Sequence, residues 1–247
     1  MSARASVDLL AWESEFFGRR LGCVVFEDTA PRLTPSAMTG FALVQAKVAA
    51  QAMTQIDALS AIGFRPVEGE MDCCYTLPVC ASGAPCAGAA ALPAAEIRLA
   101  READIPELRT LAAQTLVQSR FREPWFSDEE RQRFYAQWVT NAVRGSFDHL
   151  CLVAKGPDGL SGLVTLRNIG RQVARIGLLA VSPAARGRGT GKLLCRAALG
   201  WCCSCGFRQL WVATQTANLP ALRLYLANGA RVVHAAHWLY RGHHDSI

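Results

Sequence analysis

In the C-terminal three fifths of the chain, the spacing of apolar residues predicts an alternation of strands and helices. A short strand near residues 96–99 precedes a helix in which Asp104 and Glu107 have the spacing of a capping box. A second helix is expected after Ser127, where Glu130 again stands three residues further on. Such side chains accept hydrogen bonds from the unpaired N–H groups of a first helical turn, so they mark where each helix begins.

Apolar segments after the second helix predict a sheet. Residues 150–154 and 162–166 flank the turn KGPDG and form an expected antiparallel hairpin, and residues 175–181 read as a buried strand. Asn218 is placed to begin a later helix and Gly229 to end it. The other expected elements are a helix after residue 189, a strand over 211–214 and a strand over 232–240. This order predicts an α/β or α+β domain with a mixed sheet.

A segment rich in Ala, Gly and Pro divides the chain. Residues 78–94 read PVCASGAPCAGAAALPA and carry no charge and no periodic apolar face. We interpret them as a linker between one domain over 1–77 and a second over 95–247. A long surface loop inside a single domain is the alternative, although structureless loops of this length are uncommon.

The first domain contains a segment that matches the end of the second in pattern. ALSAIGFRPVEGEMD, residues 58–72, reads as a helix, a glycine and a strand, with Gly63 corresponding to Gly229 and Leu59 to Tyr225. We expect a partial copy of the second domain, without a complete functional site of its own, that packs beside that domain and helps to form its binding site. Chance similarity is the alternative, because glycine commonly follows a helix.

Composition excludes several classes of protein. With 51% hydrophobic and 19% charged residues the chain can form a core, and no run reaches the roughly 18 apolar residues of a membrane span. The N-terminus lacks a secretory pattern, so we expect a cytoplasmic protein. The ten cysteines are irregularly spaced, and the single C-x-x-C, Cys202 to Cys205, has no second pair, so no metal site is expected. The net charge of +6 favours an anionic ligand, but no basic run indicates nucleic acid.

The most informative segment is VSPAARGRGTGKLL, residues 181–194. Three glycines, Gly187, Gly189 and Gly191, lie between a predicted strand and a predicted helix, and Arg186 and Arg188 flank them. Glycines allow close approach of a ligand to the main chain, and the N–H groups at a helix N-terminus bind phosphate. The segment is neither a Walker loop nor a dinucleotide fingerprint. A glycine turn without a ligand is the alternative.

These residues resemble the GNAT family of N-acetyltransferases, whose R-x-x-G-x-G signature is read here as Arg186, Gly189 and Gly191. NLPALRLYLANGA, residues 218–230, is similar to the family's second acetyl-CoA motif. The resemblance implies the GNAT fold, direct transfer from acetyl-CoA in a ternary complex, and Tyr225 as the acid that protonates the thiolate. A core aromatic is the alternative role for Tyr225. The implied cofactor-binding residues are Leu179, Ala180, Val181, Arg186, Gly187, Arg188, Gly189, Thr190, Gly191, Lys192 and Asn218.

Within the family, the chain is most similar to a member that acetylates dTDP-4-amino-4,6-dideoxygalactose in enterobacterial common antigen assembly. Segments such as LLAWESEFFG, QSRFREPWF and VATQTAN carry this resemblance, which implies a nucleotide-sugar acceptor. In QSRFREPWF, Arg120 and Arg122 are candidates to bind the diphosphate, and Phe121, Trp125 or Phe126 is a candidate to cover the base or sugar. The alternative is a loop without a ligand, held in place by the packing of its aromatic side chains, with both arginines exposed to solvent. The general base stays open between Glu68, Glu70 and water.

Three other readings of the function remain. The acceptor could be another small amine or a protein N-terminus, or the chain could be a non-catalytic module that binds acetyl-CoA. Monomer and homodimer are both compatible with the sequence.

Overall fold

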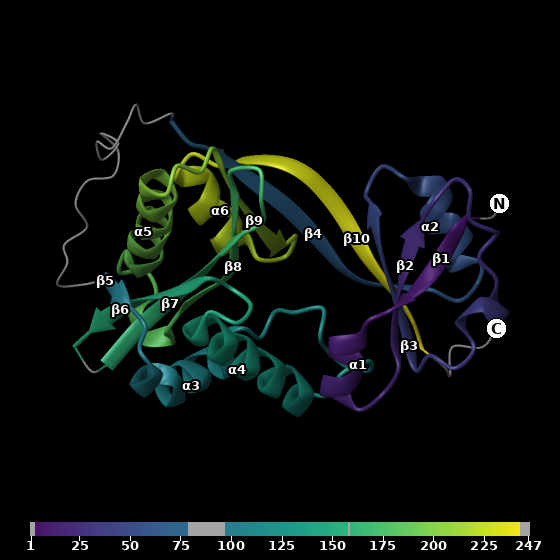
Figure 1. The fold of residues 1–247 in the computed structure, drawn as a ribbon, viewed down its shortest axis with the longest axis horizontal. Coiled ribbons are helices and arrows are strands. Elements are labelled where there is room, and N and C mark those ends of the chain that lie inside the picture. The colour runs from purple at the N-terminus through teal and green to yellow at the C-terminus, as the bar shows by residue number, and fades with distance from the viewer. Residues whose placement is uncertain (1–2, 79–96, 158, 243–247) are drawn as a thin grey trace.

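The computed structural model describes residues 3–78, 97–157 and 159–242. In that part of the chain, ten strands form one mixed sheet with the order β1-β2-β3-β10-β4-β9-β8-β7-β6-β5 (Figure 1). The strands are β1 (Ala5–Leu9), β2 (Leu21–Phe26), β3 (Leu43–Ala49), β4 (Arg65–Thr76), β5 (Ile97–Leu99), β6 (Leu150–Gly156), β7 (Gly159–Asn168), β8 (Val173–Val181), β9 (Gln209–Gln215) and β10 (Arg231–Gly242).

Helices pack on both faces of this sheet. They are α1 (Ala11–Phe17), α2 (Met53–Ser60), α3 (Ile105–Thr115), α4 (Asp128–Arg144), α5 (Thr190–Ser204) and α6 (Leu219–Ala227), with 3₁₀ turns at Pro35–Met38, Glu102–Asp104 and Pro183–Ala185. One core cluster joins α3 and α4 to one face, and another joins α5 and α6 to the opposite face (Figure 1). We refer to these as the α3/α4 face and the α5/α6 face.

The predicted elements after residue 95 are confirmed, with one local correction. The Ser127 hydroxyl accepts from the Glu130 N–H at 3.1 Å, and the Glu130 carboxylate accepts from the Ser127 N–H at 2.8 Å. The expected capping box of Asp104 and Glu107 is wrong. The Asp104 carboxylate turns back to accept from the Arg101 N–H (2.7 Å) and from the Arg98 guanidinium (2.6 and 2.8 Å). An arginine within reach offers a charged donor, which binds the carboxylate more strongly than a peptide N–H does.

The two halves of the chain, residues 3–78 and 97–242, exchange strands. β4 belongs to the first half by sequence but pairs antiparallel with β9, whereas β10 belongs to the second half and pairs antiparallel with β3. β4 and β10 also pair with each other, so they form a long two-stranded connection across the molecule (Figure 1). Each half therefore completes the sheet of the other.

The expected likeness between the two halves extends to the backbone. Gly63 and Gly229 both lie in the left-handed region, at φ 92° and 95°. The N–H after each glycine donates to the carbonyl five residues earlier, Phe64 to Leu59 and Ala230 to Tyr225, both at 3.1 Å. Leu59 is fully buried, as its counterpart Tyr225 nearly is. The same helix, glycine and strand geometry thus occurs twice.

The predicted linker lies, apart from Pro78, outside the described residues, so the domain boundaries stay a prediction. No helix in the described ranges is both long and apolar enough to cross a bilayer. The cysteines within those ranges are free thiols, and most of them are buried.

Candidate functional site

The glycine loop before α5 has the backbone of an anion-binding turn. Gly187 and Gly189 adopt φ values of 73° and 88°, which side chains rarely tolerate. α5 begins at Thr190 with no side-chain cap and no acidic residue in its first turn. The first N–H groups of a helix have no intrahelical acceptor, and here the first described helical bond runs from Leu193 N–H to the Gly189 carbonyl at 3.0 Å. The N–H groups of the first turn can therefore bind an anion.

Positive charge surrounds this helix end. Arg186, Arg188 and Lys192 are exposed, and the last two lie on either side of the first turn of α5. Gly191 allows the helix to pack closely on α6, because an added Cβ would lie 3.2 Å from Leu224 Cδ2. The predicted phosphate-binding residues therefore come together at one exposed helix N-terminus.

A gap between two parallel strands opens beside this helix end. β8 and β9 pair only where residues 173–176 meet residues 209–212. β8 continues to Val181 and β9 to Gln215, and these later residues do not pair with each other. The main chain of β8 over residues 177–181 thus faces the gap without a strand partner on that side. Leu179, Ala180 and Val181, three of the predicted cofactor contacts, lie in this stretch.

A bulge sets the geometry of β8 at the gap. Thr165 on β7 stands at the register shift, where its hydroxyl accepts from the Leu178 N–H (2.9 Å) and donates to the buried carboxylate of Asp148 (2.6 Å). A Cβ at Gly177 would collide with that carboxylate. The bulge reverses the side-chain alternation, so Ile176 belongs to the core on the α5/α6 face and Leu178 to the core on the α3/α4 face.

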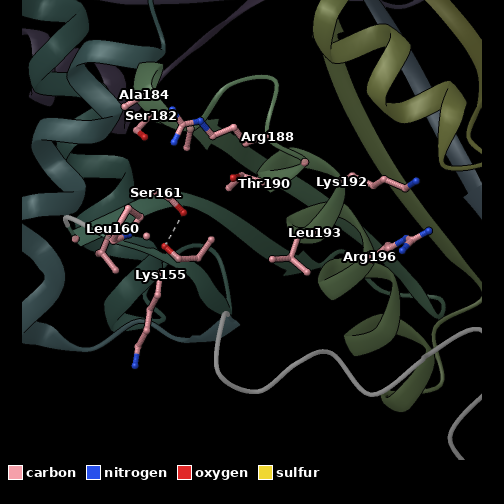
Figure 2. A pocket seen from close by; sticks show the side chains of 16 residues that line it. Lys155, Leu160, Ser161, Ser182, Ala184, Arg188, Thr190, Lys192, Leu193 and Arg196 are labelled. Atoms are coloured by element: carbon pink, nitrogen blue, oxygen red, sulfur yellow. Dashed lines mark hydrogen bonds between the residues drawn. The ribbon is translucent and has the colours of Figure 1, made fainter.

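A cavity of about 650 Å³ lies on the other side of the same loop. It is bounded by the β6–β7 hairpin and by the first turns of α5. Figure 2 shows Thr190, Leu193 and Ser161 around the hollow, whereas the charged ends of Lys155, Lys192 and Arg196 project away from it. Arg188 also lines the cavity, and its guanidinium lies toward Ser182 in the same view, so the cavity adjoins the glycine loop and has an arginine at its edge.

Tyr225 stands on α6, the helix that packs against α5. Its side chain is buried at 4% exposure, and burial raises the pKa of its hydroxyl, so the phenol is protonated at neutral pH. Among the described residues, none forms a hydrogen bond with this hydroxyl, so its proton is free to be donated. The Tyr75 hydroxyl donates to the main-chain carbonyl of Tyr225 at 3.3 Å and lies 3.1 Å from Cys195 Sγ.

Asn218 begins α6 as expected. Its side-chain oxygen accepts from the Ala221 N–H at 3.3 Å, which is the ordinary bond of a helix cap. The cap orients α6 and with it Tyr225, and a contact of Asn218 with a cofactor stays a prediction.

The loop with the predicted acceptor-binding residues packs against β4 and β10. Arg120 donates to Gln45 and to the Tyr240 hydroxyl (2.6 Å), and its guanidinium stacks on Trp238 and Phe121. The structure thus gives Arg120 internal partners from both halves of the chain.

Arg122 and Trp125 lie at the surface of this loop. The exposed Arg122 donates to the carbonyls of Val67 (2.9 Å) and Glu123 (2.9 Å) and lies over Trp125. Trp125 is only partly buried and packs edge-on against Tyr240. Both side chains remain accessible to a ligand.

A polar strip on the α3/α4 face was not anticipated as a unit. It consists of side chains from β3, β10, β4 and β8, namely Lys47, Trp238, Glu68, Glu70, Asp72 and Arg175. The sequence singled out only Glu68 and Glu70 among them. Alternation along β4 was the available signal and also covers Asp72, but the order of the strands, which brings Lys47, Trp238 and Arg175 alongside, is not visible in the sequence.

No group of three or more His, Cys, Asp or Glu residues within the described ranges is arranged to hold a metal ion.

Comparison with known proteins matches residues 110–230 to the family described as acetyltransferase (GNAT) family. The chain is 45% identical over 242 residues to a dTDP-fucosamine acetyltransferase of Escherichia coli O6:H1 (strain CFT073), and the alignment covers 98% of this chain and 100% of that protein.

Two solved structures share the fold at low sequence identity. A functionally unknown conserved protein from Staphylococcus epidermidis has a TM-score of 0.62 at 12% identity and covers 100% of this chain and 93% of its own. A tandem GNAT protein from the clavulanic acid biosynthesis pathway has a TM-score of 0.56 at 15% identity, over 90% of this chain and 75% of its own.

Proposed function

The chain belongs to the GNAT family of acetyltransferases, and we propose that it transfers the acetyl group of acetyl-CoA to the amine of dTDP-fucosamine, dTDP-4-amino-4,6-dideoxygalactose. The gap between β8 and β9, which opens beside the uncapped N-terminus of α5, is the observation that carries the cofactor assignment. The 45% identity over nearly the whole of both chains supports the acceptor.

Coenzyme A fits the site through its phosphates and its extended arm. The N–H groups of residues 187–192 would bind the pyrophosphate, with Arg186, Arg188 and Lys192 adding charge. The pantetheine arm would lie in the gap along β8. There the N–H groups near Leu179–Val181 would bind the thioester oxygen, which becomes negative when the amine attacks.

Acetyl transfer then requires a neutral amine and an acid. The amine nitrogen forms a bond to the acetyl carbon and gives up one proton to water or a nearby carboxylate, the C–S bond breaks, and the thiolate takes a proton. Tyr225 would supply that proton, because its phenol is protonated and no described residue competes for it.

Cofactor and acceptor would approach the gap from opposite sides. The loop before α5, α5 itself and Tyr225 belong to the α5/α6 face, whereas Arg122, Trp125 and the polar strip belong to the α3/α4 face. The two substrates can therefore be bound together, as a direct transfer requires.

Thiol release from acetyl-CoA tests the proposal. We expect release that depends on dTDP-fucosamine, with an acetylated sugar as product. Tyr225→Phe should lower kcat about 10²-fold and leave the KM for acetyl-CoA and the melting temperature nearly unchanged, because the hydroxyl forms no bond within the described protein. Tyr135→Phe, which removes a buried hydroxyl bonded to Ser119 at 2.7 Å, is the matched control.

Other outcomes would select the other functions. If acetyl-CoA stabilises the protein and another amine is acetylated but the nucleotide sugar is not, the cofactor assignment would be right and the acceptor would be that other amine. Stabilisation without turnover of any amine would indicate a binding module.

A further inference from the structure

The polar strip lies where no helix covers the sheet. On the α3/α4 face the two helices pack against β6, β7 and β8, and beyond them the strip extends over β4, β10 and β3. Glu70, Asp72 and Arg175 are only partly buried, with side-chain exposures of 18, 14 and 24%. A row of charges on a sheet face that is otherwise apolar is typical of a surface that binds a polar ligand.

Most charges of the strip neutralise one another. Lys47 Nζ lies 2.5 Å from Glu70 Oε1, and Trp238 Nε1 donates to Glu70 Oε2 at 2.9 Å. Arg175 donates to Asp72 at 2.8 Å. Burial raises the pKa of Glu70, but Lys47 and Trp238 more than offset this and the pKa is lowered. Glu70 is therefore ionised, and both Glu70 and Asp72 are already paired with cations of the strip.

Glu68 is the carboxylate of the strip without such a partner. Its one hydrogen bond within the described chain comes from the neighbouring Gly69 N–H at 3.0 Å, and no described cation lies within 4 Å of it. Burial raises the pKa of Glu68, and the Gly69 N–H and the more distant Arg122 oppose this only in part. A half-buried carboxylate in this situation gains from a cationic ligand.

Glu68 also lies between the acceptor loop and the open end of the gap. It stands opposite Trp238, and its neighbour Val67 accepts the hydrogen bonds of Arg122. On the other side, the Gly69 carbonyl accepts from the N–H of Thr216, the residue after β9, at 2.8 Å. Two strand spacings, about 10 Å, then separate Glu68 from β8.

We propose that Glu68 binds the ammonium group of the acceptor and so makes the site select an amine over a hydroxyl at the same position of the sugar. The proposal rests on the proposed function, since it assigns the acceptor's amine a partner. The first half of the chain, which lacks a glycine loop, would thereby supply a specificity-determining residue to the active site.

Comparison of an amine with a hydroxyl ligand tests this role. We would measure the KM for dTDP-fucosamine and the inhibition constant of dTDP-6-deoxygalactose, which carries a hydroxyl in place of the amine, for the wild type and for Glu68→Gln. We expect the KM for the amine to rise about 10- to 100-fold, as for the loss of one charged hydrogen bond. The inhibition constant should change less than about twofold, since the hydroxyl ligand lacks the charge.

Two further variants make the result interpretable. Glu68→Ala should change the KM for the amine and the inhibition constant of the hydroxyl ligand as Glu68→Gln does. The test therefore does not depend on the folding of a single variant. Glu102→Gln removes an exposed carboxylate that pairs with Arg144 at the surface, and it should leave all constants unchanged.

Each outcome decides the matter. An unchanged KM for the amine, or an equal loss of affinity for amine and hydroxyl ligands, would overturn the role of Glu68 while the wild-type activity upholds the proposed function. A wild type that does not acetylate the nucleotide sugar would overturn both.

Discussion

Arg120 links the two halves of the chain, and its replacement by methionine separates a structural from a ligand-binding role. One nitrogen, Nη1, donates to Gln45 on β3 and to the Tyr240 hydroxyl on β10. Gln45 is 7% exposed and Tyr240 fully buried, so water cannot replace the lost donor at either oxygen. Arg120→Met keeps much of the apolar volume and removes both bonds.

The expected cost follows from these contacts. A hydrogen bond from a charged donor contributes about 1.5–3 kcal/mol, and the stacking of the guanidinium on Trp238 at 4.1 Å adds about 1 kcal/mol. Because the two bonds share one nitrogen they are not additive, and we expect a loss of about 3–4 kcal/mol. Equilibrium unfolding in urea measures this, with an unchanged slope against denaturant.

An exposed arginine with similar contacts provides the control. Arg133 donates to the Phe16 carbonyl at 3.1 Å and lies over the Phe16 ring, but at the surface, so Arg133→Met should cost less than about 1 kcal/mol. If Arg120→Met instead kept its full stability and lost only affinity for the nucleotide sugar, the structural account would be refuted and the pyrophosphate role upheld.

Three smaller changes test local features. Ser127→Ala removes the cap of α4 and should cost about 1 kcal/mol in urea unfolding; no loss would contradict the capping box. Gly177→Ala forces a Cβ against the Asp148 carboxylate and should lower both stability, by about 1–3 kcal/mol, and kcat; a fully active variant would show that the bulge is not required. Arg98 holds the pKa of Asp104 at about 2, below the ordinary value near 3.9. The carboxylate therefore stabilises the fold above about pH 4 and loses this effect as the pH falls through about 2, so Asp104→Asn should be less stable than the wild type at pH 7, and this difference should shrink steadily as the pH falls from 4 to 2.

Features that depend on neighbours in sequence were predictable. The cap at Ser127, the left-handed glycines of the loop before α5 and the cap at Asn218 each need only a few consecutive residues, and the structure contains all of them. Even locally, a competing partner can win, as Arg98 does for the Asp104 carboxylate. Short-range signals therefore located the glycine loop before α5 and the helix that bears Tyr225.

Features that depend on strand order were not predictable. Nothing in the sequence places Arg120 beside Gln45, 75 residues away, or Tyr240, 120 residues away, and its expected contact with a diphosphate stays a prediction. Glu68 and Trp238 become neighbours only because β10 inserts between β3 and β4. Side-chain alternation gives the face on which a strand residue lies, but it gives no information about which strand lies beside it.

The exchange of β4 and β10 leads to a last prediction, that residues 97–247 do not fold stably alone. Without β4, the edge of β9 loses its partner, and the core under α5 and α6 loses Tyr75 and Leu77, which are buried at 2% and 6% exposure. Each contributes about 2 kcal/mol of burial, and Tyr225 loses the bond from Tyr75. When residues 1–78 are expressed with it as a separate chain, the fragment should regain cooperative unfolding and acetyl-CoA binding. The reason is that β4 of the first half is the strand that β9 lacks, and β10 of the second half is the strand that β3 lacks. Cooperative unfolding and cofactor binding by residues 97–247 alone would show that the exchanged strand is dispensable.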